Sequence, residues 1–352
     1  MTASENFRPS SEAEKSRKAV GIWLLGVASI ILGMITIGGL TRLTGSGLSI
    51  TEWKPIMGAI PPLSDAEWQD AFAKYQRIPQ YLVQNHDMTL DAFKGIFWWE
   101  WIHRFLGRLL GLAFFVPFVW FAATGAIRKS DWPRMLLLFL LGGLQGFIGW
   151  WMVTSGFEVR TSVSQYRLAI HLGTALLLLV AILWTALEYL RPGQSTGWSK
   201  RATGFALAVY GQMLLGALVA GLHAGLIYNT WPDMNGGVFP EEPFFQTPWW
   251  INFFEEPSLA QFDHRIGAYL VAAFAVWVYL KGIRLSGYAK TSAKAVAVIT
   301  AFQIFLGIAT LLLQAPVLLS AAHQVTAALL LCAAVWHAYE IRIWTPAPGR
   351  SS

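Results

Sequence analysis

Four of the seven histidines lie near the start of long apolar segments, at corresponding places, where their side chains could do chemistry. They are His103, His171, His264 and His323. A lone histidine inside a membrane is most often a hydrogen-bonded packing residue, but four at corresponding places in two copies of a repeat are hard to obtain that way. A neutral imidazole is a common metal ligand. The spacing therefore favours two metal sites, His103 with His171 and His264 with His323.

The kind of metal group follows from the number of ligands. Each pair offers two imidazoles and no cysteine, whereas zinc takes three or four ligands. Two imidazoles facing each other across a helical bundle are the usual way to hold a flat haem by both axial positions. We expect all four histidines in the first turns of helices that run inward from the outer surface. The pattern predicts one haem in each half of the chain, and His86, His223 and His337 are interpreted as structural.

One acidic residue distinguishes the two pairs. Glu100 stands three residues before His103, on the same face of a helix, whereas the residue three before His264 is the amide Gln261. A haem that only carries electrons needs no proton-transfer group beside it, but a haem that is itself chemically altered does. Glu100 is thus a candidate catalytic residue. The alternative is that it caps a helix at the interface in an electron carrier.

An arginine directly follows the first histidine of each pair, as Arg104 and Arg265. A guanidinium matches a carboxylate in a bidentate way, so both arginines could pair with haem propionates. Both could equally extend to the lipid headgroups, as long cationic side chains do near helix ends. The sequence leaves these two interpretations open.

Composition sets the environment of these residues. Of 352 residues, 13% are charged and 55% are hydrophobic, and the mean hydropathy is +0.46. Such a chain is not an ordinary soluble protein but an integral membrane protein. The net charge of +6 is better explained by membrane topology than by nucleic-acid binding. With Cys332 as the only cysteine, an internal disulfide, an iron–sulfur cluster and a cysteine zinc site are all excluded.

Apolar segments long enough to cross a bilayer recur eight times. Lysine and arginine concentrate in the short loops and in both terminal segments, which predicts that both termini are cytoplasmic. The two long loops, 43–100 and 224–261, then face outward, and their aromatic runs, including Trp68, Phe72 and Tyr75, are expected in the membrane interface. Gln314 to Pro316 should break the last apolar stretch in two. The predicted spans are 19–41, 101–127, 135–153, 168–187, 202–223, 262–280, 295–313 and 317–339.

The second half of the sequence repeats the first. Residues 100–104 are matched by 261–265, and Gln145 with Gly149 by Gln303 with Gly307. Four helices in each copy give both copies the same orientation. We therefore expect an all-α integral membrane protein with eight transmembrane helices, arranged as two duplicated four-helix bundles related by a pseudo-twofold axis along the membrane normal. The expected parts are a cytoplasmic leader (1–18), an N-terminal half (19–190), a cytoplasmic linker (191–201), a C-terminal half (202–342) and a cytoplasmic tail (343–352).

The run from Gly38 to Pro62, together with the motif Glu100-Trp-Ile-His103-Arg104 and the paired histidines, resembles the haem A synthase family over nearly the whole chain. The resemblance is to the mitochondrial and proteobacterial type. It implies a bacterial inner-membrane enzyme that oxidises the C8 methyl of haem O, through the alcohol, to the formyl group of haem A for terminal oxidases. It also implies that His103 and His171 flank the substrate haem O and that Glu100 is catalytic. His264 and His323 would ligate a resident haem b.

Partners follow from the same resemblance: haem O synthase, an electron-transfer partner and membrane lipids, with a homo-oligomer left open and no nucleic acid. A second branch of that family carries cysteine pairs in its outer loops, and this sequence has none there. Two other functions compete. The chain could be a di-haem cytochrome b that only transfers electrons, or a transporter built from parallel repeats. The transporter would leave the four aligned histidines unexplained.

Overall fold

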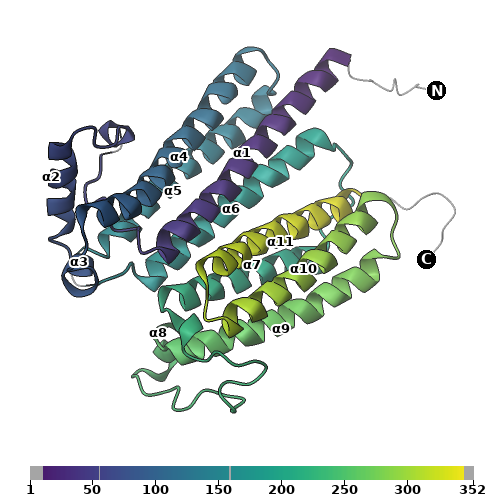
Figure 1. Ribbon diagram of the computed structural model, residues 1–352. Helices are drawn as coiled ribbons and strands as arrows, with labels where there is room; N and C mark the ends of the chain where they lie inside the picture. Colours follow the sequence, from purple (N-terminus) through teal and green to yellow (C-terminus); the bar gives the residue numbers. More distant parts are fainter. Residues whose placement is uncertain (1–10, 55, 158–159, 345–352) are drawn as a thin grey trace, which may run out of the picture.

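The computed structural model of the chain describes residues 11–54, 56–157 and 160–344, and over these residues every regular element is helical (Figure 1). The leader residues 1–10 and the tail residues 345–352 lie outside the described part. Eight of the helices are long and apolar enough to cross a membrane, which confirms the predicted number. These are α1 (Ser11–Leu43), α4 (Leu90–Ala123), α5 (Trp132–Thr154), α6 (Gln165–Leu190), α7 (Lys200–Gly221), α9 (Pro257–Gly282), α10 (Gly287–Leu312) and α11 (Val317–Ile343).

The predicted break between the last two helices is confirmed. Gln314 and Ala315 adopt left-handed backbone conformations with φ of 61° and 54°. Residues other than glycine rarely adopt this conformation, and it cannot continue a helix. Pro316 follows as the residue before α11. The chain therefore reverses direction here and crosses the membrane twice.

The helix that carries His103 begins earlier than the apolar pattern indicates. The Thr89 side chain accepts a hydrogen bond from the backbone N–H of Ala92, so α4 starts at Leu90 rather than near residue 101. The added turns bury Phe93 and Phe97. His103 consequently lies well inside α4, and the expectation that it stands in a first turn is wrong. The expectation is wrong for the other three as well: His171 and His323 are the seventh residues of α6 and α11, and His264 is the eighth residue of α9. Hydropathy does not predict this extension, because the apolar segment begins near residue 101 whereas the helix begins at Leu90.

A small helical layer covers the outer end of α4. Helix α2 (Asp65–Tyr75) begins with a capping box, in which Ser64 and Glu67 exchange side-chain and backbone hydrogen bonds, and α3 (Pro79–Gln84) follows it. The aromatic face of α2, formed by Trp68, Phe72 and Tyr75, is buried against α4. Its position in the membrane interface stays a prediction. Burying each such ring stabilises the contact by about 2–3 kcal/mol. This loop is thus a folded cap.

Helix packing follows the same pattern in both halves. In the first half, α1 packs against α4 and α6, and α5 packs against α6; in the second, α7 packs against α9 and α11, and α10 packs against α11. The halves meet where α6 contacts α7 and where α1 and α6 contact α11. Figure 1 shows the two groups of helices side by side. These neighbours agree with a duplication, while the symmetry axis and the domain boundaries remain predictions.

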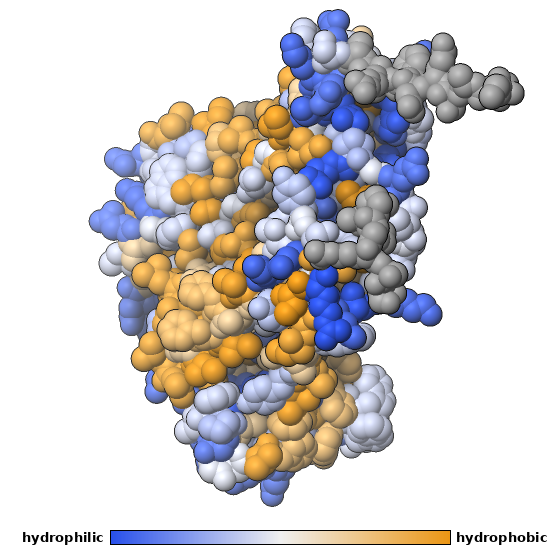
Figure 2. Space-filling view, turned by 90° about the vertical axis from the view of Figure 1, so that its right-hand side faces the viewer, coloured by the Kyte–Doolittle hydropathy of each residue, from blue (hydrophilic) through white to orange (hydrophobic). Residues whose placement is uncertain are grey.

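The surface is that of a membrane protein seen without its lipid. Large hydrophobic side chains such as Leu112, Val116 and Leu270 are exposed along the long helices. In Figure 2, hydrophobic residues cover much of the flank of the molecule, and hydrophilic residues gather near the helix ends. The first and last described segments, at Ser11 and Trp344, lie at the end of the molecule opposite α2 and α3 (Figure 1). Burial in lipid rather than water explains this apolar exterior.

Candidate functional site

All four candidate histidines lie directly over a glycine of another helix. A methyl group added to any of these glycines would come within 2.9 to 3.1 Å of the imidazole Cε1, closer than side chains normally approach. Glycine is therefore required so that the helix backbone can accept the ring. The pairs are Gly38 on α1 with His103 on α4, Gly149 on α5 with His171 on α6, Gly216 on α7 with His264 on α9, and Gly307 on α10 with His323 on α11.

The second-half pair has a spacing that fits one metal between two rings. The ring centres of His264 and His323 lie 6.5 Å apart, with their planes at 83°. A transition metal binds an imidazole nitrogen at about 2 Å, which places the centres of two opposed rings about 6 Å apart. The two helices that carry the rings, α9 and α11, both pack against α7 and α10. The pair therefore fits the two axial positions of a haem.

The first-half pair lies on the corresponding helices. His103 on α4 and His171 on α6 each lie over a glycine of a neighbouring helix, and both α4 and α6 pack against α1. Among the described residues, no three or more histidine, cysteine, aspartate or glutamate side chains gather as metal ligands. A zinc site with a full protein ligand set is thus disfavoured. A planar cofactor that needs only two protein ligands is favoured in each half.

Glutamines from neighbouring helices hold three of the four rings. The Gln145 amide contacts His171 Nδ1 at 3.1 Å and donates to the His171 carbonyl at 2.8 Å. Gln212 makes the same two contacts with His264, at 3.0 and 2.8 Å. Gln303 Nε2 lies 3.4 Å from His323 Nε2. Such outer partners fix the orientation of a metal-binding imidazole.

Sequence analysis found only part of this glutamine set. Gln145 and Gln303 stood out because each precedes a glycine by four residues in the repeat. Gln212 was missed, although it precedes Gly216 by the same spacing. The signal was available in the sequence, but it becomes meaningful only when the glycine is known to lie beneath a histidine.

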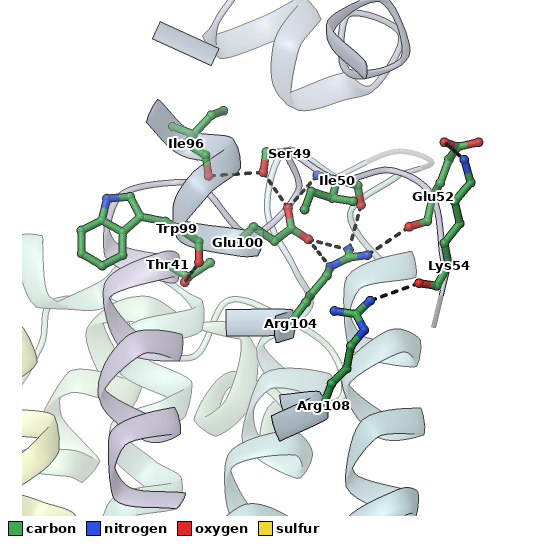
Figure 3. A network of polar contacts seen from close by, with 10 residues as sticks. All are labelled: Thr41, Ser49, Ile50, Glu52, Lys54, Ile96, Trp99, Glu100, Arg104 and Arg108. Atoms are coloured by element: carbon green, nitrogen blue, oxygen red, sulfur yellow. Dashed lines mark hydrogen bonds and ion pairs between the residues drawn. The ribbon is translucent and has the colours of Figure 1, made fainter. Parts of the chain in front are cut away.

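Glu100 is buried, with 3% of its surface exposed, and it is fully bonded (Figure 3). One carboxylate oxygen accepts from the Ser49 hydroxyl and from the Ile50 backbone N–H, both at 2.7 Å. The other accepts two bonds from the Arg104 guanidinium, at 3.0 and 2.5 Å. A carboxylate has about four acceptor positions, so all of them are filled here. The site therefore stabilises a carboxylate at this position.

Arg104 links Glu100 to the outer loop. It donates to the backbone carbonyls of Ile50 at 2.7 Å and Glu52 at 3.0 Å, and its side chain is only 14% exposed (Figure 3). Arg265 does the same in the second half, where it donates to the carbonyls of Tyr228 and Asp233. Both arginines thus clamp the loop above their helix. Pairing with haem propionates remains a prediction for both.

The same loop is tied to the outer helical layer. The Glu52 carboxylate binds Lys54 and Lys74, each at 3.0 Å, and Lys74 belongs to α2. The hydrogen bonds from Lys54 and then from Lys74 hold the pKa of Glu52 below its usual range. Because these charges are partly exposed, each pair contributes less than about 1 kcal/mol. The loop above Glu100 is therefore fixed mainly by Arg104.

The counterpart of Glu100 in the second half makes a different contact. Gln261 donates to the Tyr228 carbonyl at 3.0 Å, and its own amide oxygen is buried without a described partner. The remaining histidines lie away from the pairs: His337 contacts Ser292 Oγ at 2.9 Å in the interior, His86 pairs with its neighbour Asp87, and His223 ends α7. At the position three residues before the histidine, the first half thus carries a carboxylate and the second half an amide.

The fold and site define an all-helical, multi-pass membrane protein with two half-buried histidine pairs, and a buried carboxylate lies three residues before the first histidine of one pair. Comparison with known proteins identifies the family: the chain belongs to the cytochrome oxidase assembly protein family, whose model matches residues 21–335.

Several curated relatives are called Heme A synthase. The protein of Parvibaculum lavamentivorans is 49% identical over 334 residues, covering 94% of this chain and 96% of the relative. That of Azorhizobium caulinodans is 50% identical, covering 93% and 95%. That of Nitrosospira multiformis is 44% identical, covering 93% and 94%. The family predicted from the sequence motifs is therefore confirmed.

Proposed function

We propose that this protein is a haem A synthase, which oxidises the C8 methyl of haem O to the hydroxymethyl and then to the formyl group of haem A for terminal oxidases. The observation that carries this proposal is the buried Glu100 carboxylate, three residues before His103 on α4, with an amide at the matching place in the other half. The names of the relatives, at 44 to 50% identity over most of the chain, support it.

The two halves take different haems. His103 and His171 hold the substrate haem O, and His264 and His323 hold a resident haem b. The haem b supplies one-electron transfer between the substrate and an outside partner. The long helices expose hydrophobic side chains at their surface. The apolar tail of the substrate can pack against these side chains within the surrounding lipid. In the first half, the apolar helix surface thus contributes to substrate affinity, whereas Glu100 contributes to the oxidation of the methyl group.

Glu100 acts on the methyl group through its charge and position. Each oxidation step removes two electrons from the carbon, and with water as the oxygen source it also releases two protons. A fixed carboxylate stabilises positive charge that develops at that carbon. To take a proton as a base, Glu100 must first release one of its donors, and the neutral Ser49 hydroxyl is the one that leaves without breaking an ion pair.

Location and partners follow from the same proposal. The protein crosses a membrane several times, and we place it in the bacterial inner membrane with both termini in the cytoplasm. The excess of lysine and arginine in the short loops supports this orientation. Haem O synthase supplies the substrate, an electron-transfer partner accepts the electrons, and terminal oxidases take the product. The structure describes one chain, so a homo-oligomer remains open.

The decisive experiment is Glu100→Gln in cells that also make haem O synthase. Loss of the carboxylate should reduce haem A formation by about 100-fold or more, since proton transfer and charge stabilisation of this kind contribute 10² to 10⁴ in rate. Haem O and haem b should remain bound and appear when haem is extracted from the purified protein. The matched control, Gln261→Glu, changes the corresponding residue in the second half and should leave haem A formation intact.

Two results would contradict this assignment. Haem A formation at the normal rate in the Glu100→Gln variant would remove Glu100 from the chemistry. Extraction of haem b alone from the unchanged protein, with no haem O, hydroxylated haem or haem A, would show a di-haem electron carrier instead. The spectrum of the second-half haem serves in each variant as the control for correct folding.

A further inference from the structure

One histidine lacks the partner that the other three share. In α5, α7 and α10, a glutamine stands four residues before the glycine that lies beneath the histidine. In α1, the position four residues before Gly38 is Met34. All four helices keep the glycine, but α1 has a methionine where the other three helices have a glutamine.

The consequence is visible at His103. Its Nδ1 is buried, and no described residue provides a hydrogen-bond partner for it. His323 Nδ1 is buried without a described partner as well, but that ring keeps a glutamine contact at Nε2, whereas no described glutamine contacts the His103 ring. Met34 occupies the place of an amide: its terminal methyl carbon lies 3.7 Å from where a Cβ on Gly107 would be, one turn beyond His103 on α4. An apolar thioether in that position offers at most a very weak acceptor. The His103 ring is thus held by packing alone.

The other rings are held by polar contacts on one nitrogen. Gln145 and Gln212 each bind the ring and the backbone carbonyl of their histidine, and Gln303 reaches His323. An amide carries both a donor and an acceptor, so it can serve either tautomer of the ring. An imidazole fixed at Nδ1, as His171 and His264 are, keeps its Nε2 aimed at the metal, and losing the outer partner weakens metal binding by about 10- to 100-fold. Gln303 differs, because it contacts His323 at Nε2.

We propose that His103 is the exchangeable axial ligand of the first-half haem iron, while His171 is the fixed one. This inference rests on the proposed function, and it adds which side of the substrate iron can open. The open position faces α4, where Glu100 lies one turn before His103. In the second half both rings contact a glutamine, His264 at Nδ1 and His323 at Nε2, so a haem held there would exchange a ligand less readily. An exchangeable ligand also suits a haem that must enter as substrate and leave as product.

Carbon monoxide tests the inference without turnover, because it binds ferrous haem only where an axial position can open. The protein is purified from cells that make haem O, reduced, and titrated with the gas. One of its two haems should bind carbon monoxide. Met34→Gln should supply the missing amide and weaken that binding about 10-fold. The matched control, Met34→Leu, should behave like the unchanged protein.

The two ligands are separated by removing each one. His103→Ala should keep the first-half haem and its carbon monoxide spectrum, whereas His171→Ala should lose that haem. Gln212→Met should make the second-half haem accessible to carbon monoxide. In every variant, haem b content reports whether the protein has folded.

Three outcomes would overturn the inference: both haems remain closed to carbon monoxide, Met34→Gln binds it as strongly as the unchanged protein, or His171→Ala keeps the first-half haem while His103→Ala loses it. A first half that retains no haem O or haem A at all would instead contradict the proposed function. The two failures are therefore distinguishable.

Discussion

The glycine beneath His171 offers a sharp test of the site. In Gly149→Ala, the new Cβ would lie 2.9 Å from the imidazole Cε1, whereas ordinary contact begins at 3.4 Å. The ring must therefore retreat by about 0.5 Å, and overpacking of this kind costs about 1–3 kcal/mol. The retreat also breaks the contact between His171 and Gln145. We expect the first-half haem to bind about 10- to 100-fold more weakly, as when an outer partner is lost.

The same helix provides the control. Gly146→Ala adds the same methyl group where no atom lies within 4 Å, so it should only improve helix propensity by about 1 kcal/mol. The assay is haem per purified protein, extracted and separated into haem O, haem A and haem b, from cells that make haem O synthase. The haem b content should stay constant in both variants. Equal amounts of first-half haem in the two alanine variants would refute the reasoning that Gly149 exists to accept the ring.

Two further changes test the outer clamp and the contact between the halves. Arg104→Met removes the charged partner of the buried Glu100 carboxylate, which should destabilise the protein by about 3–5 kcal/mol. The loop that contains Ile50 and Glu52 should then become accessible to trypsin. Arg265→Met removes two hydrogen bonds to backbone carbonyls but leaves no buried charge without a partner. It should therefore lower the free energy of unfolding by about 1 kcal/mol for each bond. Gly221→Ala places a methyl group 2.6 Å from the Cα of Gln165, and because backbone cannot retreat as a side chain does, α6 and α7 should separate. The yield of folded protein in size-exclusion chromatography should fall.

Each of these changes has its own comparison. Equal trypsin sensitivity of the two arginine variants would show that the ion pair with Glu100 is not what holds the first loop. For the contact between the halves, Gly211→Ala lies on the same helix as Gly221 with no atom within 4 Å. It should fold normally, and a Gly221→Ala variant that folds equally well would show that close approach of α6 and α7 is dispensable.

The amino-acid sequence alone predicts the number of membrane helices, the four histidines and the position of the carboxylate. These properties are local. A charge-free run of about 20 residues must cross a bilayer as a helix, because no other single segment satisfies its own backbone hydrogen bonds there. Gln314 and Pro316 mark the last reversal for a similarly local reason. The repeat then paired His264 with His323, and the ring spacing of 6.5 Å agrees with that pairing.

Only the tertiary structure decided what surrounds those residues. The start of α4 at Leu90 depends on aromatic packing against α2, which hydropathy does not record. Two partners of Glu100, Ser49 and Ile50, come from about 50 positions earlier in the chain, and the amide that contacts His264 lies 52 positions before it. Contacts of this kind depend on how helices cross and not on the type of any one residue. For that reason the missing partner of His103 becomes visible only when Met34 is seen on the adjoining helix.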